Sequence, residues 1–158
     1  MVFKIMAKLT VGNGLTEYIA QLQKVADVDA YLGKAVYEGA SVVNKAVESA
    51  LQALPVDDSY GNKSQKRNGL RTIEKEGLIR SYGVASMQKD NGYWNVKLGF
   101  DGYNKLGKAN AMIARSVISG TSFMQKNDFM GKAVRSSKSA AEEAMRIKID
   151  TEIANIMK

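Results

Sequence analysis

The stretch VASMQKDNGYWNVKLGF, residues 84–100, decides the fold of this chain. Asn91-Gly92 divides it into two arms rich in strand-forming residues, and an Asn-Gly pair between such arms is the strongest short-range signal of a β-hairpin. The second arm alternates apolar and polar residues, so one of its faces is expected to be buried. Its apolar positions are Trp94, Val96, Leu98 and Phe100. We predict a hairpin over about 84–100, with strands at 84–88 and 93–100 around a turn at 89–92.

Two long amphipathic helices are predicted on either side of this hairpin. The first covers about residues 28–54, where apolar residues recur at helical spacing and the run ends at Pro55, which cannot continue a helix. The second covers about 128–156, with a stripe of methionine, alanine, valine and isoleucine. Shorter helices are predicted at about 70–82 and 110–119. This order of elements predicts an α+β fold, in which helices pack on a small antiparallel sheet.

The remaining segments complete the pattern. Residues 2–11 have the composition of a strand, and apolar spacing at 15–25 indicates a short amphipathic helix. Residues 56–69 are polar and lack apolar periodicity, so we predict a mobile surface loop there. With 158 residues, the chain is expected to form a single domain over 1–158.

Composition narrows the chemistry that the chain can perform. It contains neither cysteine nor histidine, which excludes disulfides and thiolate chemistry and removes the usual general base and the commonest metal ligand. No stretch reaches the roughly 18–20 apolar residues needed to cross a bilayer, and the first residues lack the apolar core of a signal peptide. We therefore expect synthesis in a cytoplasm and no membrane contact. The net charge of +7 favours contact with polyanions.

Three local patterns that could carry chemistry have simpler explanations. The glycine turn at 12–14 lacks the third glycine of a phosphate-binding loop. Ser86 and Lys89 have the spacing of an acyl-transfer pair, but on an extended strand they face opposite sides. Neither Asp57-Asp58 nor Glu142-Glu143 has a third ligand for a metal. We therefore expect no catalytic residue, no cofactor and no metal, and we predict that the chain is not an enzyme.

The polar loop carries a concentration of positive charge. Lys63, Lys66 and Arg67, together with Tyr60, could contact the phosphates of a nucleic acid. An ordinary solvated loop explains the same charges, and no DNA-binding motif accompanies them. Both interpretations stay open at this point.

Three segments resemble a known family. They are EGLIRSYGV at 76–84, AMIARSVISGTS at 111–122 and FMGKA at 129–133. These segments are similar to patterns in the "gene product ten-like" minor virion proteins of tailed bacteriophages, which belong to the neck or tail-completion region. In that family, the first segment leads into a hairpin, the second ends a helix with Gly-Thr-Ser, and the third starts a closing helix. Asp128 stands where the family usually has proline.

The resemblance implies a structural virion protein of the phage neck, which forms a ring of subunits and completes the tail or joins it to the head. Its partners would be further copies and other phage neck and tail proteins, with passing contact with DNA. It would lie at the head–tail junction of the virion after assembly in the host cytoplasm. The alternatives are a tail terminator protein and a basic nucleic-acid-binding accessory protein. Partner contacts are predicted at Tyr60, Lys63, Lys66, Arg67, Phe3 and Met157.

Overall fold

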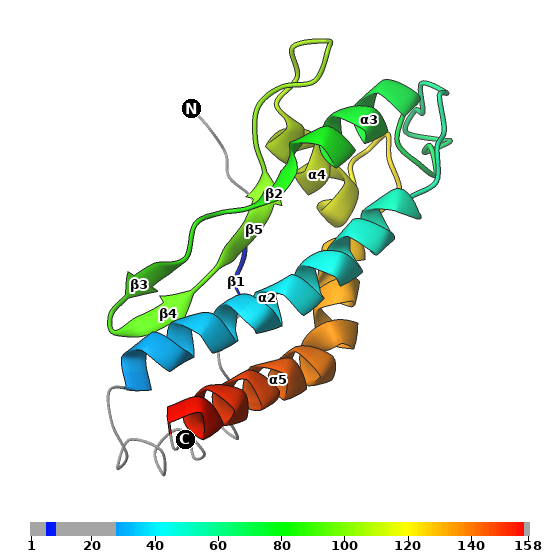
Figure 1. Cartoon of the computed structure of the whole chain (residues 1–158). Helices are drawn as coiled ribbons and strands as arrows, with labels where there is room; N and C mark the ends of the chain where they lie inside the picture. Colours follow the sequence, from blue (N-terminus) through cyan, green and yellow to red (C-terminus); the bar gives the residue numbers. More distant parts are fainter. Residues whose placement is uncertain (1–5, 9–27, 157–158) are drawn as a thin grey trace.

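The structure, a computed structural model, describes residues 6–8 and 28–156. Two long helices lie side by side, and strands and two shorter helices pack over this pair (Figure 1). The described strands pair antiparallel and are packed by helices, so the fold is α+β, as predicted. The predicted helix at 15–25 and most of the predicted strand at 2–11 lie outside the described residues.

The long helices are α2 (Val28–Gln52) and α5 (Phe129–Ile156), close to their predicted bounds. They run antiparallel, as an ion pair of 2.8 Å shows between Lys34 near the start of α2 and Glu152 near the end of α5. The apolar stripes of the two helices meet and contribute much of the core. The buried residues of these stripes include Val43, Val47, Leu51, Ala141, Met145 and Ile149.

Gly39 in α2 and Asp128 immediately before α5 each have a clear structural role. A Cβ on Gly39 of α2 would lie 2.3 Å from Cε of Met145, so the glycine allows this methionine to pack directly against α2. Asp128 Oδ1 accepts a hydrogen bond of 3.0 Å from the backbone of Gly131, which satisfies a free N–H group in the first turn of α5. The aspartate therefore starts the helix by capping it.

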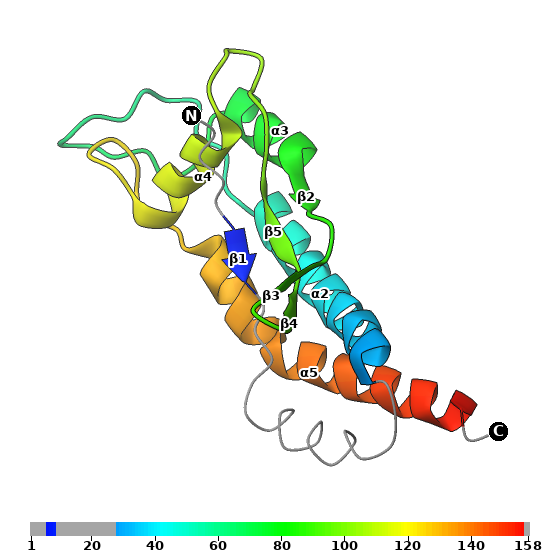
Figure 2. The same ribbon diagram turned by 90° about the vertical axis from the view of Figure 1, so that its left-hand side faces the viewer.

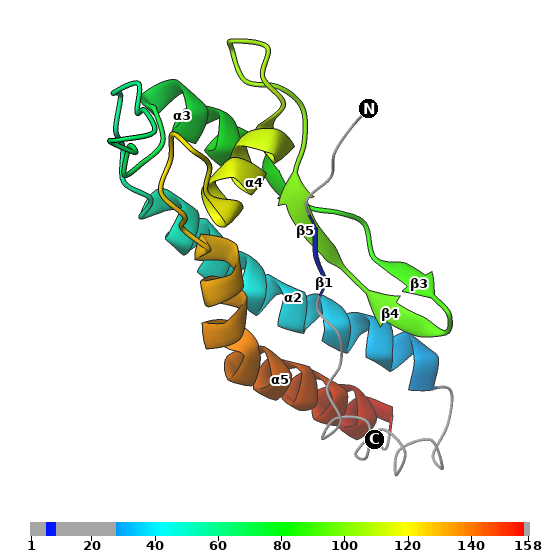
Figure 3. The ribbon, with the colours of Figure 1, turned by 180° about the vertical axis from the view of Figure 1, so that it is seen from behind.

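The strands form two separate antiparallel sheets. In the larger sheet, β5 (Lys97–Phe100) lies between β1 (Met6–Lys8) and β2 (Tyr82–Val84), and Figure 3 shows β1 beside β5. The smaller sheet pairs β3 (Gln88–Asp90) with β4 (Tyr93–Asn95). The pairing of β1 with β5 joins segments that lie far apart in the sequence.

The predicted hairpin is confirmed in position but wrong in two details. The turn comprises only Asn91 and Gly92, whose φ values of 51° and 83° fit a two-residue turn. The residues 89–90 therefore belong to strand β3 and not to the turn. The arms are also interrupted, because residues 85–87 of the first arm face only 96–97 of the second. This extra residue is a β-bulge, which bends a hairpin, so β3 and β4 leave the larger sheet and lie against α2.

Trp94 fixes this end of the hairpin to the first turn of α2. Its indole Nε1 donates to the backbone carbonyl of Asp29 at 3.0 Å, and the Asp29 carboxylate pairs with Lys89. The hydrogen bond from Lys89 holds the pKa of Asp29 below its ordinary value, although partial desolvation opposes this effect. Trp94 also packs on a second small apolar cluster, formed by Val36, Ala40 and Val96.

The shorter helices α3 (Thr72–Ser81) and α4 (Asn110–Ser119) pack on each other at the opposite end of the molecule (Figure 2). Gly77 lowers the helix propensity of α3, but a Cβ there would lie 2.8 Å from Asn110 Oδ1. The close approach of α3 and α4 therefore requires a glycine. Phe100 of β5 connects this end to α5, since its ring centroid lies 5.3 Å from that of Tyr82 and 6.3 Å from that of Phe129.

Candidate interaction surface

The polar segment 56–71 is folded back on the protein by hydrogen bonds. Asp57 accepts a bond of 2.9 Å from the backbone of Asn68, and this closes the segment on itself. Asp58 accepts bonds of 2.8 Å from the backbone and the hydroxyl of Thr72, at the start of α3. The bond from the Thr72 backbone holds the pKa of Asp58 below its ordinary value. The two adjacent carboxylates thus organise the loop, while its mobility stays a prediction.

The middle of the loop pairs with the segment that connects α4 to α5. The Arg67 backbone N–H donates to the Phe123 carbonyl at 3.0 Å, and Arg67 accepts from the Gln125 backbone at 3.0 Å. A Cβ on Gly61 would lie 2.2 Å from the Phe123 carbonyl oxygen, so only glycine permits this approach. Thr121 Oγ1 accepts from the backbone of Phe123 and Met124, which shapes the turn after α4. Figure 2 shows the two segments beside each other.

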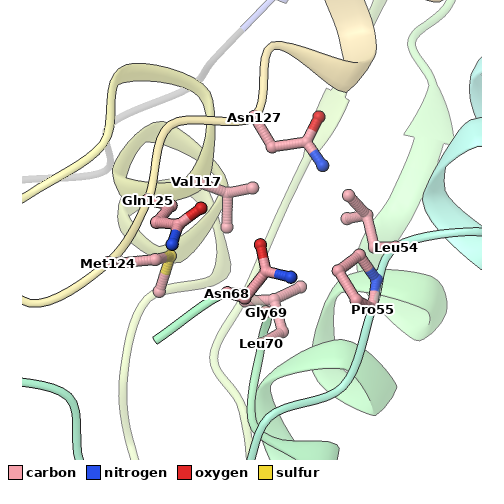
Figure 4. Close-up of a pocket in the computed structure, with 9 residues that line it drawn as sticks. All are labelled: Leu54, Pro55, Asn68, Gly69, Leu70, Val117, Met124, Gln125 and Asn127. Carbon is pink, nitrogen blue, oxygen red and sulfur yellow. The ribbon is translucent and has the colours of Figure 1, made fainter. Parts of the chain in front are cut away.

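A small cavity lies where these two segments meet the end of α2 (Figure 4). The side chains of Asn68, Gln125 and Asn127 surround it together with Leu54 and other residues. Its volume is about 10 Å³, which is roughly the space of one water molecule. The cavity belongs to the joint between the segments and is too small for a ligand.

Glu74, Arg67 and Arg71 form an ion cluster beside the loop. The Glu74 side chain is 5% exposed and lies 2.8 Å from Nη1 of Arg67, which is itself only 12% exposed. Arg71 adds an ion pair of 3.3 Å and a backbone hydrogen bond of 3.1 Å to the same carboxylate. Burial alone would raise the pKa of Glu74, but the bonds from Arg67 and Arg71 outweigh burial and lower it. Both arginines are therefore committed to an interior carboxylate.

A groove of about 550 Å³ opens beside this cluster, between α4, the loop at 101–109 and the segment after α4. Three large apolar side chains from different elements line it and are strongly exposed: Tyr103 (66%), Met112 (57%) and Phe123 (52%). Ile113 and Met124 contribute buried apolar surface. Convergence of exposed apolar side chains on one groove is typical of a docking surface.

The charged residues that line the groove are two basic side chains and one acidic side chain. Arg67 and Lys108 line it, and the carboxylate of Glu74 is the acidic group among its lining residues. Because Glu74 is balanced by two arginines, the exposed charge at the groove is that of Lys108. The site therefore offers an apolar wall with one exposed cation, Lys108, at its rim.

The structure separates the residues that the sequence predicted for partner contacts. Tyr60, Lys63 and Lys66 are exposed, and Tyr60 stacks against Arg71, whose Cζ lies 5.7 Å from the ring centroid. The guanidinium of Arg67 is held by Glu74 in the wall of the groove, so Arg67 is less exposed than the two lysines, and its role as a partner contact stays a prediction. Phe3 and Met157 lie outside the described residues.

Sequence reasoning missed the groove residues Tyr103, Met112 and Phe123. Met112 lies in the predicted helix at 110–119, and the two aromatic residues lie in polar segments without periodicity. A usable signal was present, since isolated aromatic residues in loops otherwise rich in glycine and lysine have no core to enter. Their convergence depends on the fold and could not be read from spacing.

The part of the chain that the structure describes, residues 6–8 and 28–156, shows neither a metal-binding cluster nor a membrane-spanning helix. Within that part of the chain, no group of three or more metal-binding side chains comes together. In the same part, no helix has the length and apolar character to cross a bilayer.

Comparison with known proteins gives no assignment. The chain matches no protein-family model, no curated protein and no solved structure.

Proposed function

We propose that this chain is a structural component of the neck of a tailed bacteriophage, which acts by binding copies of itself and neighbouring virion proteins. In this role it completes the tail or joins it to the head as a ring of subunits. The role requires surfaces that bind proteins and no reactive side chain.

The main support is how the three segments that resemble neck proteins pack together. Tyr82 of the first segment and Phe129 of the third both contact the ring of Phe100. Gly77 of the first segment lies against Asn110, which immediately precedes the second. The three segments are separated in the sequence but pack as one unit around α3, β5, α4 and the start of α5. This is expected if they descend together from one structural module.

The character of the surface is a second support. The groove beside α4 exposes aromatic and thioether side chains, which are enriched where proteins bind each other. Among the described strands, β1 and β3 lie at the edges of their sheets, and the backbone of an edge strand can pair with a strand of a partner.

Electron microscopy of the purified protein tests the proposal. We expect rings when the protein is concentrated alone or mixed with the tail-tube subunits encoded beside it. Disruption of the gene in the encoding phage is expected to leave filled heads and tails that do not join. A protein that stays monomeric under these conditions, together with normal joining after gene disruption, would contradict the proposal. A ring on the free end of tails before heads attach would identify tail termination instead.

A second candidate function is nucleic-acid binding. It is favoured by Lys63 and Lys66, which are exposed, have no ion pair among the described residues and lie near Tyr60. In this case, affinity for duplex DNA falls with salt, and the slope of the logarithmic plot falls by about one for each lysine changed to alanine. Lys45→Ala is the matched control, because Lys45 is an exposed lysine on the distant helix α2. Unchanged slopes in both loop variants would exclude this function.

A further inference from the structure

We infer that the groove beside α4 receives a short acidic segment of another protein, which inserts an aromatic or aliphatic side chain between Tyr103, Met112 and Phe123. This inference concerns the chemistry of the occupant and does not depend on the proposed virion role. The groove is already formed within the chain, so an occupant meets a prepared surface.

The apolar wall requires an apolar partner group. Tyr103, Met112 and Phe123 come from the loop at 101–109, from α4 and from the segment after α4, and all are more than half exposed. Burial of exposed apolar surface of this kind against an apolar partner group is favourable in free energy. The groove volume of about 550 Å³ lies within the roughly 300–1,000 Å³ usual for binding sites.

The rim requires negative charge on the partner. Lys108 lines the groove and forms no ion pair among the described residues. Lys66 is exposed in the neighbouring loop, next to Arg67 of the groove wall. The acidic residue in the wall, Glu74, is already neutralised by two arginines. A carboxylate on the partner can therefore pair with Lys108 without meeting a free negative charge.

The same features favour a protein segment over a nucleic acid. Nucleic-acid surfaces combine stacking rings with several cations that follow the phosphate backbone. Here the wall includes Met112, Ile113 and Met124, which offer no stacking plane, and Arg67 is not available for phosphates. Methionine, aromatic residues and arginine are the side chains enriched at protein interfaces.

A peptide selection tests the inference. The purified chain is used to select from a phage-displayed library of random linear peptides, and the dominant peptide is synthesised with a fluorescein label. We expect the selected peptides to share acidic residues around an aromatic or aliphatic residue. Fluorescence anisotropy then gives the Kd for the wild type and for single variants, with a labelled oligothymidylate as the competing probe.

The variants are chosen so that loss of binding is distinguished from loss of fold. Tyr103→Ala and Met112→Ala are expected to raise the peptide Kd by about tenfold or more, because they remove central apolar contacts. Lys108→Glu is expected to weaken binding, with the largest effect at low salt. Tyr93→Ala is the matched control, since Tyr93 is 74% exposed on β4 and does not line the groove. Urea unfolding midpoints close to the wild type show that each variant is folded.

Three results would overturn the inference. They are a selection without acidic consensus, a peptide Kd that is unchanged in folded Tyr103→Ala and Met112→Ala, and oligothymidylate binding that depends on these residues while peptides do not bind. The last result would assign the groove to single-stranded nucleic acid.

Discussion

Removal of the Glu74 carboxylate is expected to destabilise the protein strongly. Glu74 accepts from Arg67 at 2.8 Å and from Arg71 at 3.3 Å, and both the Glu74 and Arg67 side chains are largely buried. Loss of one partner of a buried ion pair leaves the other charge uncompensated and costs about 3–5 kcal/mol. Since Arg67 borders the groove and can recover some hydration, we take about 3 kcal/mol for Glu74→Leu.

Urea unfolding measures this loss directly. With an m-value of about 2 kcal/mol/M, a loss of about 3 kcal/mol moves the unfolding midpoint down by about 1.5 M. The double variant Arg67→Met with Glu74→Leu removes both charges together, and apolar replacement of a whole buried pair is often nearly neutral. We therefore expect the double variant to be more stable than the sum of the single variants implies, by at least about 1 kcal/mol. A midpoint shift below about 0.3 M for Glu74→Leu, or strictly additive variants, would refute the reasoning.

The same carboxylate predicts a pH dependence. The pKa of Glu74 lies below the ordinary value of 4.5 in the folded protein, because the arginine hydrogen bonds outweigh burial. Above 4.5 its stabilising contribution is fully present. As pH falls through 4.5, the unfolded chain binds the proton first, so stability is lost on the acid side. In Glu74→Gln, urea midpoints measured across this acid range are expected to fall less steeply than in the wild type.

Three further substitutions, one of them with a matched control, test the fold. Gly77→Ala places a Cβ 2.8 Å from Oδ1 of Asn110 and is expected to destabilise the protein by about 1–3 kcal/mol, although alanine has the better helix propensity. The matched control is Gly83→Ala, which is expected to change the urea midpoint little because the space around Gly83 is open. Trp94→Phe keeps an aromatic ring but removes the indole hydrogen bond to the first turn of α2, so calorimetry is expected to show a loss of about 1 kcal/mol. Gly61→Ala forces the loop away from the facing backbone carbonyl, and limited proteolysis is expected to cut this loop faster than in the wild type.

The helices were predictable because their stripes are local. The bounds 28–54 and 128–156 differ from the observed helices by two residues or fewer, since Pro55 and Asp128 mark ends in the sequence itself. The hairpin was predicted in place, but its bulge was not. The register shift between 85–87 and 96–97 accompanies the contact of Trp94 with α2, which is a long-range contact that no local pattern contains.

The surface was predicted less well than the fold. The loop at 56–69 resembles a solvated segment in composition, yet Asp58 accepts a hydrogen bond from the backbone of Thr72 in α3. The Arg67 backbone also bonds to the backbone of Phe123 and Gln125 in the segment after α4. Arg67, Lys63 and Lys66 look equivalent in the sequence, and only the fold shows that one of them is paired inside. For the ion cluster, the local signal was Glu74, three residues after Arg71 at the start of a helix, which is the spacing of a capping carboxylate.

The pairing of α2 with α5 has a consequence for biosynthesis. When a ribosome has made α2, the helix that covers its apolar stripe has not been translated, because α5 begins only at Phe129. The nascent chain thus carries an uncovered amphipathic helix until α5 has been synthesised. In the same way, β1 cannot pair with β5 before β5 has been synthesised. The apolar stripe of α2 can consequently be covered only after α5 has been synthesised, and until then the nascent chain is a natural client for holding chaperones.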